Sequence, residues 1–428
     1  MALNEFPVWL AGTEFPAIEP AAPLPERVDV AIVGAGYTGL AAARVLARHG
    51  ARVAVLEAHT VGWGASSRNG GMVLSGLKLE AAQLMASYGP AAARRMFAAS
   101  LAAIDCVEQI VSEEAIDCDF RRSGHLLLAH RPAHFHAFAR ESALLRREFA
   151  HPTRLVPPGE LRDEIGSGVF HGGLVDEASA GLNPARFVAG LGCAAVRAGA
   201  QIFEHTPAVR LVRAGCGWRV GTARGELRAD MLLAAAGAYT GRALPWLQRK
   251  IVPLGSYIIA TEPLPAGLAR ELSPRDRMIF DSKHLLSYFR LTPDRRMLFG
   301  GRARFFPESP RMVRESAALL QQAMLRVYPQ LRGVALEYAW GGTLDVAFDL
   351  MPHAGQIDCM YYAIGYAGHG VAMASYLGTQ LGACLAGAPF DNPFAGMPFP
   401  GAPLGLYDGR PWFLPLVGAW YRLLDLLA

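Results

Sequence analysis

The alternation of apolar runs with a glycine-rich turn predicts a strand–helix–strand unit near the start of the chain. Residues 30–33 form an apolar run after Asp29, and residues 34–39 form the turn. Small and apolar residues then recur at helical spacing as far as about His49. A second apolar run over 52–56 is followed by Glu57. Because both runs are continuous rather than alternating, we expect two strands of a buried parallel sheet.

Patterning along the rest of the chain predicts further helices and two kinds of sheet. The run 229–238 is apolar and ends in small residues, so we expect a strand parallel to the first, with Gly237 at its cofactor end. Short runs between polar turns over 251–307 favour an antiparallel sheet. The other predicted elements are helices over 80–115, 132–149, 183–198, 310–328 and 371–385, and strands over 122–129, 200–204, 208–213, 218–222 and 361–364.

The predicted fold class is α/β, with a Rossmann-like domain around the parallel sheet and an inserted antiparallel-sheet substrate domain. A chain of 428 residues exceeds what one hydrophobic core usually serves, so two lobes are expected. Neither lobe is one continuous segment. The expected boundaries are a lead-in at 1–26, the Rossmann-like domain at 27–105, 166–245 and 339–395, the substrate domain at 106–165 and 246–338, and an apolar extension at 396–428.

Composition narrows the class of protein. The chain is 52% hydrophobic and 18% charged, which describes a globular protein with a large core. Its net charge is +4 and its basic residues are spread out, so no nucleic acid partner is expected. Six scattered cysteines without a C-x-x-C pair favour free thiols in the cytoplasm. The uncharged run 359–390 is long enough to span a bilayer, but its glycines and polar residues favour a buried strand and helix.

The turn at 34–39 has the spacing of a dinucleotide-binding site. Gly34 permits the tight turn, Gly36 lets the backbone approach a pyrophosphate, and Gly39 lets helix and strand pack closely. The start of the helix offers free N–H groups and a positive dipole end to phosphate. Glu57 follows Gly34 by 57 − 34 = 23 residues, where a carboxylate is expected to bind a ribose diol. A glycine-rich turn in some other α/β domain is the alternative.

A second glycine-rich stretch at 61–72 comes soon after the second strand and is expected to lie beside the same cofactor. Its glycines let the backbone approach a flat ring, which a domain that binds only a nicotinamide would not need. A flexible surface loop is the alternative. The hydrogen-bond donors of this stretch are Ser66, Ser67, Arg68 and Asn69.

Several motifs together resemble the D-amino-acid-oxidase-like superfamily of FAD-dependent oxidoreductases. They are the strand, turn and Glu57 unit, GWGASSRNGGM at 62–72, AAAGAYT at 234–240 and GYAGHG at 365–370. Within it the chain is most similar to γ-glutamylputrescine oxidase-type enzymes of polyamine catabolism, and the similarity covers nearly the whole chain. The stretches that carry this are VWL at 8–10, GASSRNGG at 64–71, RLTPDRRMLFGG at 290–301 and PWFLPLVGAWYRLLD at 411–425.

The resemblance implies that the Rossmann-like domain is an FAD-binding domain. FAD would be non-covalent, because the cysteine that carries flavin in some relatives has no counterpart near Trp340. The helix start at 368–371 would face the flavin N1–C2=O edge, with His369 either adding to this field or capping the helix. Val209 would meet the adenine through its backbone. The implied FAD-binding residues are Gly34, Gly36, Tyr37, Thr38, Gly39, Glu57, Ala58, Ala65, Ser66, Arg68, Asn69, Gly70, Gly71, Val209, Gly237, Gly368, His369, Gly370 and Val371.

Two departures from the family pattern bear on the substrate and the acceptor. Amino-acid-oxidising relatives clamp the substrate carboxylate with an arginine, and the matching stretch 340–345 has none. A carboxylate without a bidentate partner is poorly held, which favours an amine or a γ-glutamyl-amine. Arg290 or Arg302 would bind a distant carboxylate, or both are surface arginines at a sheet edge. Some relatives place a lysine near flavin N5 where Phe299 aligns here, so O2 and another electron acceptor both stay open.

The implied reaction is oxidation of a CH–NH donor. A neutral amine would deliver hydride to flavin N5, water would hydrolyse the imine to an aldehyde, and O2 would take the electrons and give H2O2. Neither a dedicated general base nor a metal site is expected. Tyr288, Trp340 and Tyr366 are candidate walls around the amine, with core packing as the alternative for each. The candidate catalytic residues are His369, Tyr288, Trp340, Arg290 and Arg302.

The segment 412–428 is apolar and amphipathic. It would dock on its own domain by default, or on another subunit or a membrane surface. Two alternatives to a cytoplasmic amine oxidase are therefore kept. One is a membrane-associated FAD-dependent amine or amino-acid dehydrogenase that passes electrons to a quinone, and the other is a non-catalytic flavoprotein subunit.

Overall fold

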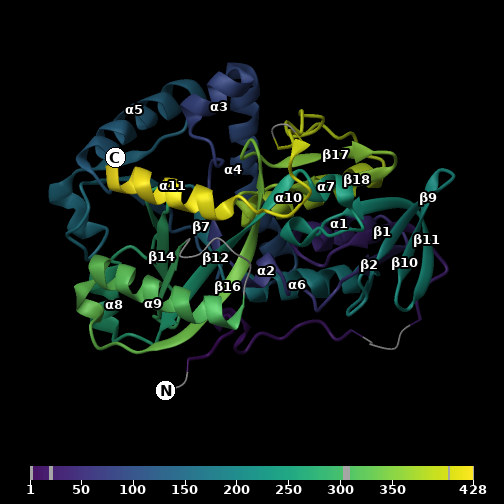
Figure 1. The fold of residues 1–428 in the computed structure, drawn as a ribbon, viewed down its shortest axis with the longest axis horizontal. Helices are drawn as coiled ribbons and strands as arrows, with labels where there is room; N and C mark the ends of the chain where they lie inside the picture. The colour runs from purple at the N-terminus through teal and green to yellow at the C-terminus, as the bar shows by residue number, and fades with distance from the viewer. Residues whose placement is uncertain (1–2, 19–22, 302–308, 403–404, 428) are drawn as a thin grey trace.

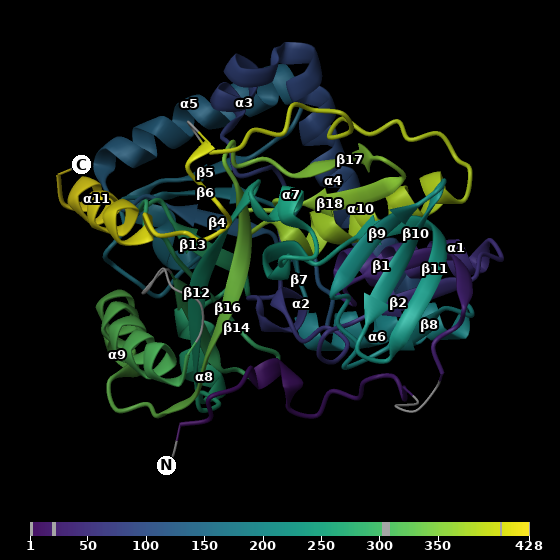
Figure 2. The ribbon, with the colours of Figure 1, turned by 45° about the vertical axis from the view of Figure 1, so that its right-hand side comes forward.

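Two eight-stranded sheets form the framework of the protein and lie side by side (Figures 1 and 2). The structure, a computed structural model, describes residues 3–18, 23–301, 309–402 and 405–427. The N-terminal segment runs beneath both sheets in the view of Figure 2. The chain passes between the two sheets several times, so each sheet is built from separate segments of the sequence.

The first sheet is parallel at its centre. There β1 (Arg27–Val33) pairs with β2 (Val53–Leu56) on one side and with β11 (Gly225–Ala234) on the other. The expected parallel strand before Gly237 is therefore confirmed. Because these strands run in one direction, the turns that follow them meet at one edge of the sheet. The other strands of this sheet are β8 (Gln201–Phe203), β9 (Arg210–Ala214), β10 (Gly217–Thr222), β17 (His353–Ile357) and β18 (Met360–Ile364).

Two helices on this sheet pack unusually closely. They are α1 (Tyr37–Arg48) and α10 (Gly370–Leu385). A Cβ added at Gly378 of α10 would come within 2.3 Å of the Thr38 carbonyl oxygen on α1, so only glycine allows this approach. The uncharged run that contains α10 is thus buried in protein, as predicted. The other helices around this sheet are α2 (Ala65–Arg68), α4 (Pro90–Glu113), α6 (Pro184–Arg197) and α7 (Pro245–Gln248).

The second sheet is almost entirely antiparallel. Its strand order is β16-β12-β15-β14-β13-β4-β6-β5, and one pair, β13 with β4, is parallel. The antiparallel pairing expected over 251–307 is confirmed for the described strands. The strands are β4 (His125–Leu128), β5 (Arg154–Val156), β6 (Gly173–Asp176), β12 (Ile251–Thr261), β13 (Met278–Asp281), β14 (Ser287–Leu291), β15 (Met297–Gly301) and β16 (Leu336–Ala347).

Strand pairing and core packing differ from three of the predicted domain boundaries. Strand β6 belongs to the antiparallel sheet, although the sequence placed 166–245 in the FAD-binding domain. Strand β16 stays in the antiparallel sheet as far as Ala347, beyond the expected boundary at 338. Conversely, Val107 and Ile110 at the end of α4 pack in the core of the first lobe. Continuous helices and long strands cross these boundaries without a break in pattern, which is why composition did not reveal them.

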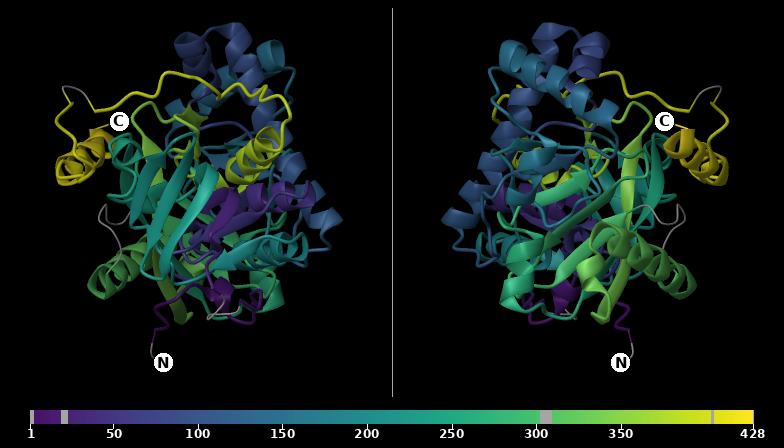
Figure 3. Two further views of the ribbon diagram at one scale, coloured as in Figure 1. Left: turned by 90° about the vertical axis from the view of Figure 1, so that its right-hand side faces the viewer. Right: turned by 90° about the vertical axis from the view of Figure 1, so that its left-hand side faces the viewer.

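Most of the remaining elements lie at the periphery. Helix α11 (Leu414–Leu427) is at the outer rim in both views of Figure 3. Within the described residues, no helix has the length and apolar character needed to cross a membrane. The other peripheral elements are α3 (Ala81–Tyr88), α5 (Pro132–Phe149), α8 (Ala266–Leu272) and α9 (Pro310–Val327), whereas β3 (Met72–Val73) and β7 (Ala180–Gly181) pair with each other in the interior.

Candidate functional site

Two cavities meet between the lobes. The larger, which we call the nucleotide cavity, lies at the carboxyl ends of β1, β2 and β11. The smaller, which we call the substrate cavity, lies against the antiparallel sheet. A ligand that fills the nucleotide cavity would therefore end at the mouth of the substrate cavity. The residues that line both cavities are Ala65, Asn69, Leu344, Gly368 and Val371.

The glycine-rich turn after β1 forms one end of the nucleotide cavity. Gly34 has φ +108°, and a Cβ there would lie 2.7 Å from the Ala235 carbonyl oxygen. Gly39 does not line the cavity. A Cβ on Gly39 would come within 2.0 Å of the Gly34 oxygen, so this glycine acts by allowing α1 to pack on the turn. The implied FAD residues that line this cavity are Gly34, Gly36, Tyr37, Thr38, Glu57, Ala58, Ala65, Ser66, Asn69, Val209, Gly237, Gly368, Gly370 and Val371.

Glu57 and Val209 lie where the nucleotide end of a ligand would bind. The Glu57 carboxylate accepts hydrogen bonds from the backbone N–H groups of Ala35, at 2.8 Å, and His59, at 2.9 Å. A carboxylate has further lone pairs, so a ribose diol fits beside these bonds. The Val209 N–H donates to the Gly221 oxygen, which leaves the Val209 carbonyl as the backbone group for an adenine.

Residues 64–71, which we call the flavin loop, lie where the two cavities meet. Asn69 holds the loop shape, because its Nδ2 donates to Ala65 O and its Oδ1 accepts from Gly71 N. The Arg68 guanidinium donates to Trp63 O at 2.8 Å and stacks over the Trp63 ring. Arg68 lines the substrate cavity, Gly70 does so as well, and Gly71 lines neither cavity.

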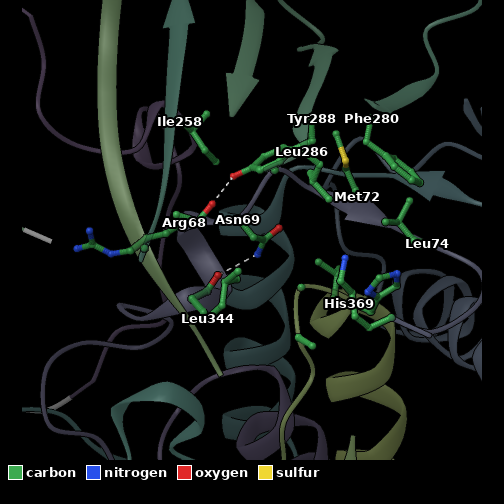
Figure 4. Close-up of a pocket in the computed structure, with 18 of the residues that line it drawn as sticks. Arg68, Asn69, Met72, Leu74, Ile258, Phe280, Leu286, Tyr288, Leu344 and His369 are labelled. Atoms are coloured by element: carbon green, nitrogen blue, oxygen red, sulfur yellow. Dashed lines mark hydrogen bonds between the residues drawn. The ribbon is translucent and has the colours of Figure 1, made fainter. Parts of the chain in front are cut away.

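The substrate cavity has largely apolar walls. Figure 4 shows Tyr288 and His369 on opposite sides of it. The Tyr288 hydroxyl lies 3.0 Å from Ser256 Oγ. Its ring fills a slot that two glycines leave open, since a Cβ would approach the ring to 3.3 Å at Gly70 and to 2.3 Å at Gly300. The apolar residues that line this cavity are Met72, Leu74, Ile258, Phe280, Leu286, Leu344 and Val371.

Lys78 is a lining residue that sequence reasoning missed. It brings a cation to the substrate cavity from the segment that follows β3. Its only sequence signal is its position soon after the flavin loop, and spacing along an irregular segment does not show which way a side chain points. Ser256 and Phe280, which also line the cavity, were missed for the same reason.

His369 stands at the N-terminus of α10, where the two cavities meet. Its Nδ1 is buried and has no hydrogen-bond partner among the described residues. Burial, with a smaller contribution from Lys78, lowers the pKa of the His369 imidazole from 6.5 to about 3, so the ring is neutral at working pH. A buried polar atom without a partner is costly unless a ligand satisfies it. Together with the helix N-terminus, this atom fits a flavin edge that carries polar groups.

We expect no ionisation of His369 to appear in the pH dependence of flavin reduction. A His369→Gln variant should keep the rising limb of the wild-type profile between pH 6 and about pH 10, because that limb would come from deprotonation of the substrate amine. Stopped-flow reduction across this range measures it. Disappearance of the limb in the variant would show that His369 itself titrates.

Asp345 places a buried carboxyl in the wall of the nucleotide cavity. It lies near the end of β16, and its Oδ2 accepts the Gly365 N–H at 2.8 Å. Burial raises the pKa of this carboxyl from 3.8 to about 6. The bond to Gly365 orders the turn that leads into α10, so Asp345 supports the start of this helix.

The raised pKa of Asp345 predicts a pH-dependent stability. The folded protein binds this proton more tightly than the unfolded chain, so the stabilisation is present below pH 3.8 and is lost as pH rises through about 6. The shift corresponds to about 3 kcal/mol. Asp345→Asn keeps an acceptor for Gly365 N–H and does not ionise. The melting temperature of the wild-type apoprotein should therefore fall relative to that of the variant between pH 4 and about pH 6.5; parallel curves would contradict this.

Several predicted substrate residues lie elsewhere. Arg290 is buried, and its guanidinium donates to the backbone oxygens of Gly71, at 2.8 Å, and Leu182, at 3.1 Å. It lines neither cavity, so it is neither a surface arginine nor placed to bind a substrate carboxylate. Arg302 lies outside the described residues. Phe299 is buried in the core of the antiparallel sheet, stacked on Phe289, and so does not occupy a place beside the flavin.

Two of the three candidate aromatic walls also lie elsewhere. Trp340 is fully buried, and its Nε1 donates to Arg68 O at 2.9 Å, so it supports the flavin loop from outside the substrate cavity. The Tyr366 hydroxyl bonds Thr38 Oγ1 at 2.7 Å, and its ring lines the nucleotide cavity. Tyr288 alone of the three lines the substrate cavity. The two-residue period of a strand predicts which side chains share a face of the sheet, but it does not predict which segment packs against that face.

Comparison with known proteins decides the family. Residues 29–383 match the family described as FAD dependent oxidoreductase, DAO. The chain belongs to this family. It is 32% identical to the γ-glutamylputrescine oxidoreductase of Escherichia coli over 408 residues, which cover 93% of each chain.

Solved structures share the fold. Glycine oxidase from Geobacillus kaustophilus has a TM-score of 0.70 at 22% identity, covering 85% of this chain and 95% of that one. L-amino acid deaminase from Proteus myxofaciens has a TM-score of 0.72 at 16% identity, covering 90% and 96%. Membership of this family makes FAD the cofactor of this enzyme, and the glycine-rich turn and Glu57 in the wall of the nucleotide cavity fit that cofactor. No cysteine lines either cavity in the described part of the chain.

Proposed function

We propose that this protein oxidises a C–N bond of an amine or a γ-glutamyl-amine. The observation that carries the proposal is the junction of the two cavities. Because the same residues line both, a substrate in the smaller cavity lies directly against the end of the FAD site. Bound FAD would supply the hydride acceptor. The protein chain supplies position, dehydration and charge.

The lining residues favour a neutral amine over an ammonium ion. Lys78 contributes a cation, and the His369 imidazole is neutral rather than protonated. A nearby positive charge disfavours protonation of a bound amine, and loss of that proton frees the lone pair that pushes hydride away. Apolar walls exclude water while Tyr288 and Ser256 offer hydroxyl groups to orient the amine.

Two observations support an amine over a plain α-amino acid. Leu344 stands at the cavity junction, in the stretch where amino-acid-oxidising relatives were expected to carry an arginine. Arg290, the other arginine considered within the described residues, is bonded to backbone oxygens. The similarity in sequence to a γ-glutamylputrescine oxidoreductase points the same way.

The acceptor is proposed to be O2. The substrate loses a hydride and a proton to become an imine, water converts the imine to an aldehyde and a released amine or ammonia, and O2 takes two electrons and two protons to become H2O2. The second candidate is a dehydrogenase that feeds a quinone at a membrane surface. It is favoured by the exposed side chains of Trp412, Leu416 and Trp420, which recur every fourth residue at the periphery. A non-catalytic flavoprotein subunit is the third candidate.

Product analysis tests the proposal. Incubation of the FAD-loaded enzyme with polyamines and their γ-glutamyl conjugates in air should give aldehyde and H2O2 in equal amounts. Aldehyde formation with a quinone or dye but not with O2 would select the dehydrogenase. Absence of aldehyde with any amine and any acceptor would contradict both enzymatic candidates.

A further inference from the structure

Three buried side chains hold backbone carbonyls of the flavin loop. They approach from outside, since none of the three lines either cavity. We call these three residues the loop clamp. The bonds run from Trp340 Nε1 to Arg68 O at 2.9 Å, from Trp9 Nε1 to Asn69 O at 2.9 Å, and from an Arg290 Nη to Gly71 O at 2.8 Å.

The loop clamp gathers three distant parts of the chain. Trp9 comes from the N-terminal segment, Arg290 from β14 and Trp340 from β16, and their exposed fractions are 3%, 6% and 0%. Trp9 and Trp340 belong to one apolar cluster. The Arg290 guanidinium lies 5.8 Å from the centre of the Trp9 ring. The three donors thus form one buried unit against the underside of the loop.

The bonds to Arg68 and Asn69 fix two peptide planes. A peptide unit is planar and trans, so its N–H points opposite to its carbonyl oxygen. When the clamp holds the carbonyls of Arg68 and Asn69 from outside, the N–H groups of Asn69 and Gly70 are turned the other way. Asn69 lines both cavities and Gly70 lines the substrate cavity. The Asn69 N–H is therefore directed toward the place where the two cavities meet, and the Gly70 N–H toward the substrate cavity beside it.

We propose that the loop clamp positions the flavin loop so that the backbone N–H groups of Asn69 and Gly70 are presented to bound FAD. The N-terminal segment is then part of the FAD site rather than a surface lead-in. Its attachment supports this. Asn4 N–H donates to Glu337 O at 2.8 Å and Ala339 N–H donates to Asn4 O at 2.9 Å, which ties the segment to β16 beside Trp340.

The test compares tryptophan variants that lose only an indole N–H donor. Trp9→Phe and Trp340→Phe remove one clamp bond each. Trp218→Phe is the matched control, because Trp218 Nε1 also donates to a backbone oxygen, that of Cys359 at 3.2 Å. Trp218 lies opposite Ala229 near the start of β11, at the end of that strand away from the nucleotide cavity. For each variant we would measure apoprotein melting temperature, the FAD dissociation constant and the midpoint potential of the bound flavin.

We expect the FAD dissociation constant to rise about tenfold in Trp9→Phe and Trp340→Phe and to stay unchanged in Trp218→Phe. The midpoint potential should fall in the clamp variants only, because misdirected N–H groups stabilise the negative charge of reduced flavin less well. A purely structural role would lower melting temperature without moving the potential. Unchanged affinity and potential in the clamp variants, or equal losses in the control, would overturn the proposal.

Discussion

Gly39→Ala is expected to weaken FAD binding severely. The added Cβ would lie 2.0 Å from the Gly34 carbonyl oxygen and 3.1 Å from Ile32 Cγ2. The Gly34 oxygen belongs to the backbone, and the Gly34 N–H is bonded to the Leu56 oxygen at 2.9 Å, so the turn cannot easily move away from the new Cβ. Helix α1 must then move away from the turn. A displacement of about 1 Å at the phosphate-binding end should weaken FAD binding by about 100-fold or more. Flavin absorbance of the purified protein and titration of the apoprotein with FAD measure this.

Gly267→Ala is the matched control for Gly39→Ala. Gly267 lies in helix α8, and a Cβ there would meet nothing within 4 Å. The control should keep full FAD content and gain up to about 1 kcal/mol of stability, because alanine favours a helix over glycine. If Gly39→Ala bound FAD as tightly as the control, the cavity after β1 would not be the phosphate site.

Gly300→Ala should impair substrate oxidation while FAD stays bound. The new Cβ would come within 2.3 Å of the Tyr288 ring, which Gly70 confines on another side. The ring must leave its slot and enter the substrate cavity. We expect the rate of flavin reduction to fall roughly 10- to 100-fold, because the amine is displaced from its position against the flavin. Anaerobic stopped-flow mixing measures the rate, and flavin absorbance reports the FAD content.

Two further variants distinguish displacement of the Tyr288 ring from loss of its hydroxyl and from a general effect of replacing glycine with alanine. Tyr288→Phe removes the hydroxyl that faces Ser256 but leaves the ring in place, so its effect should be smaller than that of Gly300→Ala. Gly168→Ala, where a Cβ would meet nothing within 4 Å, should reduce flavin as the wild type does. A Gly300→Ala enzyme with the wild-type reduction rate would show that the cavity beside Tyr288 does not hold the substrate.

Sequence patterns predicted the strand, turn and helix beside the nucleotide cavity because the residues that shape these elements lie close together in the sequence. The strand, the turn at 34–39 and the first helix lie within twenty-five residues, and sterics alone require glycine where the backbone passes close to itself. The parallel partner β11 was predicted because a continuous apolar run needs burial on both faces. Strand β6, by contrast, joins the antiparallel sheet through pairing with β4, a contact that no local pattern records.

The substrate half could be predicted only in part because its rules are not local. The two-residue period placed Tyr288 and Arg290 on one face, and both do face the flavin loop. The period did not show that Tyr288 would line the substrate cavity, or that Arg290 would donate hydrogen bonds to backbone oxygens. Trp340 was expected to line the substrate site because it is aromatic, yet its indole N–H donates a hydrogen bond to the backbone oxygen of Arg68. A side chain's partner depends on which distant segment packs beside it.

Anaerobic reduction of the bound flavin by amines tests the central claim most directly, because it needs no knowledge of the electron acceptor. The FAD-loaded enzyme would be mixed without oxygen with a panel of amines, γ-glutamyl-amines and α-amino acids. The account predicts saturable loss of the oxidised flavin absorbance with at least one amine or γ-glutamyl-amine and slower or no loss with plain α-amino acids. Flavin that dithionite reduces but that stays oxidised with every amine would contradict it.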